Sequence, residues 1–458
     1  MLRVSSYNLY IPLGNNKKEF MLINGRTGTI DVVSYKVYEA IQKAVNKSVK
    51  VEDIGQDIVN ILTQRGYFTF ESIEEEKDFF CNMVNSVQKL SQKYIHFTIM
   101  PTYNCNFRCS YCYERNLLKN GKEWLEAVMS DETVDKIFNY VDDLEKKDYK
   151  VNKTFTLYGG EPLLNENHDI VKYIIYKCHE RDKIVKAVSN GYDLKYYEDL
   201  LGKGMIENIQ FTLDGIEEYH NSKRFLNSKA PTFNTIVDNI SLALDKGVDV
   251  FVRSNIDINN VNQISELTTF YNKKGWTKYE NFNYYFKNVH GCYISKDLYV
   301  NENEIIDRIK ESEGNYQNNN IADTIAKNLK YLLENGKAVI PRASFCGATT
   351  SMYVIDPFGD VYPCWEVVGQ KDDCCIGNIR DNDITNNRIF RYWHGRTIVK
   401  ITECAECPYA IFCGGGCPAH IRARKNNIYL PYCAEFKEIF NEVAKSVYSD
   451  FVLNKENL

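Results

Sequence analysis

Three cysteines stand close together in the stretch PTYNCNFRCSYCYE, residues 101–114. Cys105, Cys109 and Cys112 are separated by three and then two residues. Structural zinc usually takes four ligands, whereas four thiolates ordinarily hold the four irons of a cubane cluster. Three thiolates would leave one iron open to another ligand. The spacing therefore predicts a 4Fe–4S cluster with an open iron. A zinc site completed by a remote ligand, or unconnected buried thiols, are the alternatives.

A second group of cysteines lies towards the C-terminus. Cys346 and Cys364 frame a C-x12-G-x4-C pattern, and CAECPYAIFCGGGC follows from residue 404. This stretch contains Cys404, Cys407, Cys413 and Cys417, and the next cysteine along the chain is Cys433. A chain without an export signal keeps its cysteines reduced, so the 15 cysteines favour metal binding over a disulfide framework.

Composition limits the function classes. The chain has 458 residues, 44% hydrophobic and 26% charged, and a net charge of −5. These values are typical of a globular protein with several domains, and they argue against binding a nucleic-acid backbone. We find no signal-peptide core and no apolar run near the length of a membrane span. The sequence therefore predicts a cytoplasmic protein with no membrane and no nucleic-acid partner.

Residues 1–92 are expected to form a winged-helix-like domain. Strand-like runs (YNLYIPL, EFMLIN and TIDVV) precede two helices, and YFTF follows as a further strand. Ser34 is a candidate N-cap for the first helix, and Gly66 closes the second. The apolar stripe of the first helix is Val37, Ile41, Ala44 and Val45. That of the second is Ile54, Ile58, Ile61 and Leu62. A small cap that stabilises the next domain is the alternative to a binding function.

Residues 93–335 alternate strand and helix, the pattern of a parallel sheet covered by helices. The six strand-like runs are YIHFTIM, KTFTLY, KIVKAV, IENIQFTL, VDVFVRSNI and NFNYYF. Six βα units are too few for a closed eight-stranded barrel, so the sequence predicts an α/β fold with an open, partial (β/α)6 barrel. Special residues gather where these strands end, in GGEP, SNG, DG and DINN. Parallel α/β sheets place their sites at that edge.

GGEP, at residues 159–162, directly follows a strand. Glycines let a backbone approach a ligand closely, and a tight turn is the alternative. The later strand ends offer hydroxyl, amide and guanidinium groups suited to ribose hydroxyls and a carboxylate. A structural role remains open for each of them, and Arg253 can equally be a paired surface arginine.

Taken together, the CX3CX2C motif, GGEP and the seven-cysteine pattern at 346–433 resemble a radical S-adenosylmethionine enzyme with a C-terminal SPASM domain, over roughly 93–458. The resemblance implies that the aromatic residue before the third cysteine lies by the adenine. It also implies that the GGEP backbone binds the methionyl amine, and that later strand ends contact ribose and carboxylate. The cofactor-binding residues so implied are Tyr111, Gly159, Gly160, Glu161, Ser189, Thr212 and Arg253.

A SPASM domain, at 336–458, implies two auxiliary clusters beside the first, three 4Fe–4S clusters in all. The outer one would be held by Cys404, Cys407, Cys413 and Cys433, and the inner one by Cys346, Cys364 and Cys417. No cysteine directly precedes Cys346. Either Cys292, Cys374 or Cys375 completes the inner cluster, or that cluster also has an open iron, the three being free thiols.

Relatives of this architecture mostly act on peptides and proteins, and residues 1–92 resemble a leader-peptide recognition element. The sequence thus predicts a maturase of the thioether, sactipeptide or ranthipeptide type. It would crosslink a precursor peptide after hydrogen abstraction by a 5′-deoxyadenosyl radical, with electrons from a flavodoxin or ferredoxin. Sulfatase maturases generally carry Asp directly after the G-x4-C cysteine, where Trp365 and then Glu366 stand here. Sulfatase-maturase-like oxidation of Cys or Ser and a non-catalytic zinc-binding module are the alternatives. No general acid or base is assigned; His220 beside DG is only a candidate.

Overall fold

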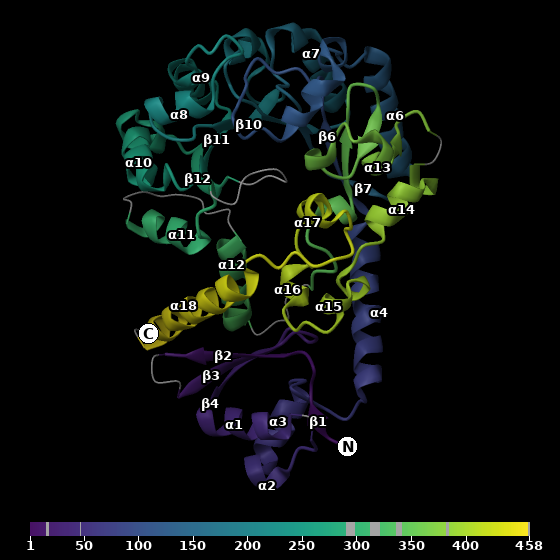
Figure 1. The fold of residues 1–458 in the computed structure, drawn as a ribbon, viewed down its shortest axis with the longest axis vertical. Coiled ribbons are helices and arrows are strands. Elements are labelled where there is room, and N and C mark those ends of the chain that lie inside the picture. The colour runs from purple at the N-terminus through teal and green to yellow at the C-terminus, as the bar shows by residue number, and fades with distance from the viewer. Residues whose placement is uncertain are drawn as a thin grey trace. The chain divides into compact units, whose positions relative to one another are not determined.

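The computed structural model describes residues 1–14, 18–45, 47–289, 298–311, 321–335, 341–381 and 384–456. Its internal contacts divide the chain into two compact units (Figure 1). The first unit comprises Met1–Ser91, Asn319–Thr349 and Gly395–Leu458, and the second comprises Gln92–Asn318 and Thr350–His394. The division into functional domains at 1–92, 93–335 and 336–458 stays a prediction.

The second unit is built on a mostly parallel sheet. Its six central strands follow one another in chain order and are each parallel to their neighbours. They are β6 (Tyr94–Ile99), β8 (Thr154–Leu157), β9 (Ile184–Val188), β10 (Ile206–Thr212), β11 (Asp249–Ile256) and β12 (Phe282–Asn288). The predicted α/β fold with six parallel strands is confirmed.

Short strands extend this sheet beyond β6. β13 (Met352–Ile355) pairs parallel to β6, and β14 (Asp360–Tyr362) and β15 (Gly377–Asn378) follow it in antiparallel pairing. β7 (Lys150–Val151) also pairs with β6. Three strands between residues 352 and 378 therefore extend the sheet whose strand β6 leads into the first cysteine motif.

Helices cover the outer side of the six strands, as Figure 1 shows for α7, α9 and α10. The helices between and after the strands are α5 (Lys122–Leu125), α6 (Asp131–Lys146), α7 (His168–His179), α8 (Glu217–Lys223), α9 (Phe233–Asp245), α10 (Ile264–Lys273), α11 (Glu302–Glu311), α13 (Lys371–Cys374) and α14 (Arg388–His394). On α6 and α7, buried apolar residues recur at helical spacing. An apolar stripe at helical spacing packs against the sheet, so the sequence alone is enough to predict these two helices and the faces that they bury.

The first unit begins with an antiparallel sheet of β2 (Asn8–Leu13), β3 (Glu19–Asn24) and β4 (Ile30–Ser34). Its further N-terminal elements are α1 (Tyr35–Ala44), α2 (Val51–Ile54), α3 (Gln56–Gln64) and the pair β1 (Arg3–Val4) with β5 (Phe68–Thr69). Ser34 takes the N-cap position, but its side chain makes no capping hydrogen bond. The three strands of the sheet, α1 and β5 agree with the prediction for residues 1–70, whereas β1 was not predicted and the second predicted helix is divided into α2 and α3.

The apolar stripe expected for the second helix is wrong in part. Val59 and Leu62 are the buried residues of α3, whereas Ile61 is 56% exposed. Gly55, at φ +96°, separates α2 from α3. Because α2 and α3 are two separate helices, residues spaced at helical intervals across both of them do not lie on one face.

The long helix α4 (Ile73–Ser91) was not expected, although the sequence marks its start. The Ser72 hydroxyl accepts a hydrogen bond from the Glu75 amide at 3.1 Å, and the Ser72 amide donates to the Glu75 carboxylate at 2.7 Å. This reciprocal pair is a capping box, for which S-x-x-E is the sequence signature.

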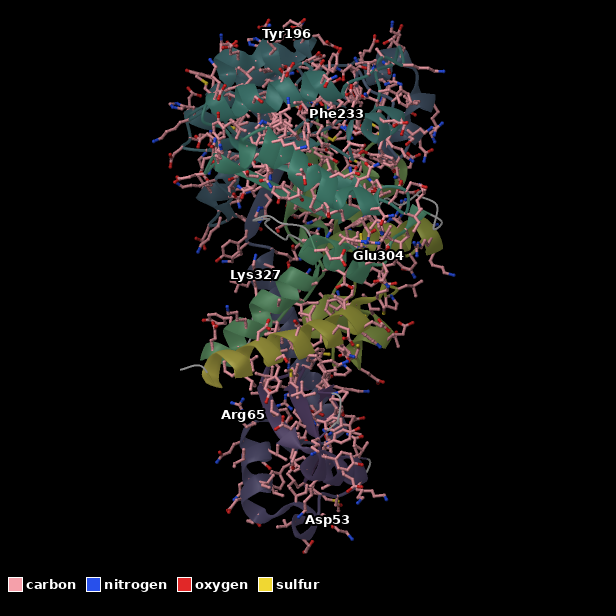
Figure 2. All side chains as sticks on the ribbon, turned by 90° about the vertical axis from the view of Figure 1, so that its left-hand side faces the viewer. Asp53, Arg65, Tyr196, Phe233, Glu304 and Lys327 are labelled. Atoms are coloured by element: carbon pink, nitrogen blue, oxygen red, sulfur yellow. The ribbon has the colours of Figure 1, made fainter. Side chains whose placement is uncertain are left out.

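The C-terminal part of the first unit carries Cys404, Cys407, Cys413 and Cys417 on or between short helices. These are α15 (Thr402–Ala405), α16 (Ala410–Cys413) and α17 (Pro418–Lys425). Figure 2 shows α12 (Ile321–Asn335), which carries the labelled Lys327, packed alongside α18 (Phe436–Glu456). Within the described ranges, no helix is long and apolar enough to cross a membrane.

Candidate functional site

A cavity of about 380 Å³ opens at the carboxyl ends of the parallel strands in the second unit. It is lined by every residue that the sequence assigned to the first cluster and its cofactor. These are Cys105, Cys109, Cys112, Tyr111, Gly159, Gly160, Glu161, Ser189, Thr212 and Arg253. Their convergence follows from the sheet, because Thr212 and Arg253 are direct register partners on β10 and β11.

The cysteine loop after β6 is held by backbone hydrogen bonds rather than by regular structure. The Arg108 amide donates to the Phe225 carbonyl at 2.9 Å, and the Ser110 amide donates to the Lys223 carbonyl at 3.1 Å. The Arg108 guanidinium also donates to the Cys105 carbonyl at 2.8 Å. The loop is therefore fastened to the segment that follows α8, far away in sequence.

The three thiols of this loop are close enough to affect one another's ionisation. Burial raises the pKa of Cys105, and negative charges on Glu161, Cys109 and Cys112 raise it further. Burial, with Glu114 and Cys109, raises the pKa of Cys112 to about 12. Thiols in this setting ionise only beside a strong positive charge such as bound iron. The chemistry of the donor set thus fits an iron–sulfur group. In the part of the chain that is described, no three His, Cys, Asp or Glu side chains converge on a single-ion site. The ligand assignment therefore stays a prediction.

The two glycines of GGEP let the end of β8 lie against the cysteine loop. A Cβ on Gly160 would lie 2.2 Å from the Asn104 carbonyl oxygen, and one on Gly159 would lie 2.6 Å from that of Thr102. The Glu161 amide donates to the Asn104 carbonyl at 2.8 Å. Glycine is required here because two backbone segments touch, in addition to any ligand that the cavity holds.

Glu161 fixes the geometry of two strand ends. Its carboxylate accepts hydrogen bonds from the Ser189 hydroxyl at 2.7 Å and from the Asn190 and Leu163 amides at 2.6 and 2.9 Å. The side chain is 2% exposed. Burial raises its pKa to about 7, although these three donors oppose the shift. Its carboxylate therefore joins the end of β8 to the end of β9, and the Ser189 hydroxyl is occupied in the same bond.

Tyr111 is held by a polar network that sequence reasoning missed. Its hydroxyl donates to the Asp214 carboxylate and accepts from Arg224 Nη1 at 2.9 Å and Asn255 Nδ2 at 3.2 Å. Asn255 in turn accepts a bond from Arg253 Nε at 2.9 Å. Asp214 belongs to the strand-end motif DG and Asn255 to the strand-like run VDVFVRSNI, whereas no signal in the sequence marked Arg224. The network fixes the ring of Tyr111 in the cavity wall.

His220 is part of the support for this network. The Asp214 amide donates to His220 Nδ1 at 3.3 Å, and His220 Nε2 lies 3.2 Å from the Thr232 hydroxyl. Burial, together with Arg224, lowers its pKa well below the usual range, so the imidazole is neutral. With both ring nitrogens engaged and 0% exposure, His220 has a structural role rather than that of an acid or base.

Another part of the cavity lining carries carboxyl and aromatic groups. Glu114 and Glu366 both line the cavity, with Tyr158 and Trp365, whose ring centroids are 5.7 Å apart. Burial, with the charge of Glu366, raises the pKa of Glu114 to about 8. Trp365 and Glu366, which follow Cys364 in sequence, are thus brought beside the first cysteine motif.

The first unit brings most of the second cysteine group together. Burial raises the pKa of Cys404 to about 12, and the thiols that add to the shift are Cys413, Cys407 and Cys433. These four are the predicted ligands of the outer cluster, and their donor chemistry fits one. Cys346 and Cys417 also belong to this unit, whereas Cys364, Cys374 and Cys375 belong to the second unit. Cys375 donates to the Gly377 carbonyl at 3.0 Å, and Cys292 lies outside the described residues. The inner ligand set stays a prediction.

Three consecutive glycines join the cysteine-bearing segments of the first unit. Gly414, Gly415 and Gly416 have φ of +74°, +82° and +72°. A Cβ on Gly414 would lie 2.5 Å from the Ser344 carbonyl oxygen, and one on Gly416 would lie 1.9 Å from that of Tyr432. The GGG turn thus lies against the residues just before Cys346 and Cys433, which only glycine permits.

The model of the radical SAM superfamily matches residues 99–268. This segment holds the first cysteine motif, GGEP and the strand ends that line the cavity. The chain therefore carries a radical SAM domain over this segment, and that superfamily implies S-adenosylmethionine and a 4Fe–4S cluster. The alternative of a non-catalytic zinc-binding module is not retained.

Two curated relatives are maturation or biosynthesis proteins. The cysteine-type anaerobic sulfatase-maturating enzyme of Clostridium perfringens (strain 13 / Type A) is 23% identical over 73% of this chain and 92% of its own length. The antilisterial bacteriocin subtilosin biosynthesis protein AlbA of Bacillus subtilis (strain 168) is 23% identical over 78% of this chain and 79% of its own.

Two solved structures share the fold. Native anSMEcpe with bound AdoMet and Cp18Cys peptide has a TM-score of 0.56 and 18% identity, and covers 80% of this chain and 99% of that one. Streptococcus suis SuiB bound to precursor peptide SuiA has a TM-score of 0.52 and 13% identity, and covers 94% and 98%.

Proposed function

We propose that this enzyme installs a crosslink in a ribosomally synthesised precursor peptide, and that the bond is a thioether from a cysteine sulfur to a carbon. The proposal joins the cavity of the radical SAM domain to two further features. One is the N-terminal module of residues 1–92, and the other is the cysteine group of the first unit.

The observation that carries the proposal is the extent of the structural likeness. The match to SuiB bound to its precursor peptide covers 94% of this chain, against 80% for anSMEcpe. The wider match supports a fold shared along most of the chain with an enzyme that binds a precursor peptide. We assign leader-peptide binding to residues 1–92 on this ground, together with the sheet β2–β3–β4 and its covering helices.

In this proposal different residues of the cavity bind the first cluster and S-adenosylmethionine. Cys105, Cys109 and Cys112 hold the first cluster, which with S-adenosylmethionine supplies a 5′-deoxyadenosyl radical for hydrogen abstraction. The guanidinium of Arg253 pairs with the methionyl carboxylate, since charge-assisted bonds of this kind are strong. Tyr111 packs against the adenine, and Glu161 keeps the ends of β8 and β9 in place.

In this proposal the second cysteine group holds the clusters that accept the electron released by the substrate. We assign Cys404, Cys407, Cys413 and Cys433 to an outer auxiliary cluster, and Cys346, Cys364 and Cys417 to an inner one. We take the inner cluster to have an open iron rather than a fourth ligand from Cys292, Cys374 or Cys375. That iron can then bind a substrate cysteine thiolate, which is the feature that favours a thioether product. A flavodoxin or ferredoxin is the proposed electron donor to the first cluster.

The test is co-production with a short cysteine-bearing peptide encoded beside the gene, followed by mass spectrometry. A product that has lost two hydrogens and one alkylatable cysteine supports the thioether. A modified product in which every cysteine can still be alkylated contradicts it. The Cys105→Ala enzyme is the matched control, because it lacks a ligand of the first cluster and should leave the peptide unchanged.

A second candidate, oxidation of Cys or Ser in a sulfatase, is favoured by Glu366. This carboxylate lines the cavity two residues after Cys364, near the place where sulfatase maturases are expected to carry an Asp. The sequence match to the sulfatase-maturating enzyme also covers 92% of its length. Incubation with a cysteine-containing sulfatase peptide distinguishes the candidates, because oxidation yields a carbonyl that a hydrazide captures and a thioether does not.

A further inference from the structure

Arg396 is a fully buried arginine of the first unit, which also holds most of the second cysteine group. Its side chain is 0% exposed. Nε donates to the Ile428 carbonyl, and Nη2 donates to the carbonyls of Gly415 at 2.8 Å and Leu430 at 3.4 Å. All of its hydrogen-bond partners are thus neutral backbone oxygens of the first unit.

The remaining nitrogen of this guanidinium has no partner among the described residues. Nη1 is buried and makes no hydrogen bond. Nor does any described carboxylate lie within ion-pair distance of Arg396. A buried charge without a counter-charge is expensive, and a buried N–H without an acceptor adds to that cost. Because an arginine stays protonated in proteins, an anion must offset the charge.

The ionisable groups whose charge acts on Arg396 are thiols of the second cysteine group, and Cys404, a predicted ligand of the outer cluster, acts most strongly. Burial lowers the pKa of Arg396, and the charges that oppose this shift are those of Cys404, Cys346, Cys417 and Cys413. Gly415 adjoins the unpartnered nitrogen, since a Cβ there would lie only 3.6 Å from Nη1.

We infer that Arg396 is a positioning residue of the outer auxiliary cluster, the one proposed on Cys404, Cys407, Cys413 and Cys433. Its Nη1 donates a hydrogen bond to a sulfur of that cluster, and its charge favours the reduced state. This inference rests on the cofactor assignment of the proposed function. To that assignment the inference adds a residue that raises the reduction potential of the outer cluster.

The direction of the effect follows from electrostatics. Reduction adds one electron to a cluster that its thiolates already make negative. A fixed positive charge in a low-dielectric interior stabilises that added charge, and hydrogen bonds to sulfur act in the same sense. The cluster beside Arg396 is therefore easier to reduce than it would be beside a neutral residue.

The first test is an anaerobic redox titration of the reconstituted enzyme, followed by electron paramagnetic resonance. Arg396→Met should shift the outer cluster so that, at a fixed potential, its reduced-to-oxidised ratio falls about tenfold, which is 59 mV for one electron. Arg396→Lys, which keeps the charge but lacks Nη1, should shift it less. The first cluster should keep its wild-type potential in both variants.

Arg424→Met is the matched control, since it removes the same charge from an exposed arginine on α17. Solvent screens that charge, so the outer cluster should keep its potential. An Arg396→Met enzyme with full iron content and an unchanged outer potential would overturn the inference. So would a shift of equal size in Arg424→Met.

A second measurement does not need Arg396→Met, in case that variant fails to assemble. Wild-type enzyme grown with arginine labelled with 15N at its η nitrogens should show a 15N hyperfine coupling in the reduced outer cluster. The coupling should be absent in Arg396→Lys. Its absence in the wild type would overturn the inference. Neither experiment needs the peptide, so a failed crosslinking assay leaves this result standing, whereas zinc in place of iron would refute the cofactor assignment itself.

Discussion

Gly160→Ala is the sharpest test of how the cavity is built. The added Cβ would lie 2.2 Å from the Asn104 carbonyl oxygen and 2.3 Å from that of Tyr103. Carbon and oxygen approach no closer than about 3.3 Å without strain, so the two segments must separate by roughly 1 Å. Both obstacles are backbone atoms, and no side chain can rotate away to relieve them.

That displacement acts on the loop that begins at Cys105. It breaks the Glu161–Asn104 backbone hydrogen bond and moves the first cluster relative to the strand ends. A displacement of 1 Å costs on the order of a hundredfold in rate. We therefore expect Gly160→Ala to form 5′-deoxyadenosine about a hundred times more slowly per bound cluster, with the fold retained by circular dichroism.

The control is Gly247→Ala in the same unit. Gly247 has φ +75° and nothing within 4 Å of an added Cβ, so the substitution costs only the left-handed backbone strain, about 1 kcal/mol. Its rate of 5′-deoxyadenosine formation should match the wild type. Equal rates in Gly160→Ala and Gly247→Ala would refute the reasoning and leave Gly160 as an ordinary turn residue.

Three further predictions concern other parts of the site. Because the native pKa of Glu161 is about 7 and its ordinary value is 4.5, the unfolded carboxyl loses its proton first. The contribution of the protonated Glu161 carboxyl to the free energy of unfolding is full below pH 4.5 and falls as the pH rises to 7, by at most about 3 kcal/mol. Because Glu161→Gln has no such proton to lose, its melting temperature should depend less on pH between 4.5 and 7 than that of the wild type. A wild-type slope in this variant would contradict the assignment. Arg224→Met removes a donor to Tyr111, and a bond of that kind contributes about 1.5–3 kcal/mol, so equilibrium dialysis should show S-adenosylmethionine affinity reduced about tenfold to a hundredfold with iron content unchanged. Unaltered affinity would show that the ring needs no such support. Gly416→Ala places a Cβ 1.9 Å from the Tyr432 carbonyl oxygen, next to a predicted outer ligand, and should lower iron per chain while S-adenosylmethionine cleavage persists. Full iron loading would argue against that ligand set.

Much of the fold was readable in advance because its signals are local. Four of the six strand-like runs end in a turn motif, and the apolar residues of α6 and α7 recur at helical spacing. The failures have equally local causes. Gly55 broke a helix that the stripe through Ile58 treated as continuous, and the capping box at Ser72 was overlooked.

The residues that line the cavity were predicted from motif and strand position, but their supporting partners were not. Arg224 reaches Tyr111 from 113 residues away, and Asn255 reaches it from 144. Spacing in sequence carries no information about such pairs, because only the packed sheet brings them within hydrogen-bond distance.

By itself, the sequence determined which thiols are available, that six strands lie parallel, and that their ends share one edge. These properties depend on residue type and on periods of a few residues. Tertiary structure alone decided that GGEP presses on the cysteine loop, that His220 is locked in a structural role, and that Arg396 is buried among thiols with one nitrogen unpaired. Burial and long-range contact decide each of these, since the free energy of a buried charge depends on what surrounds it and not on its neighbours along the chain.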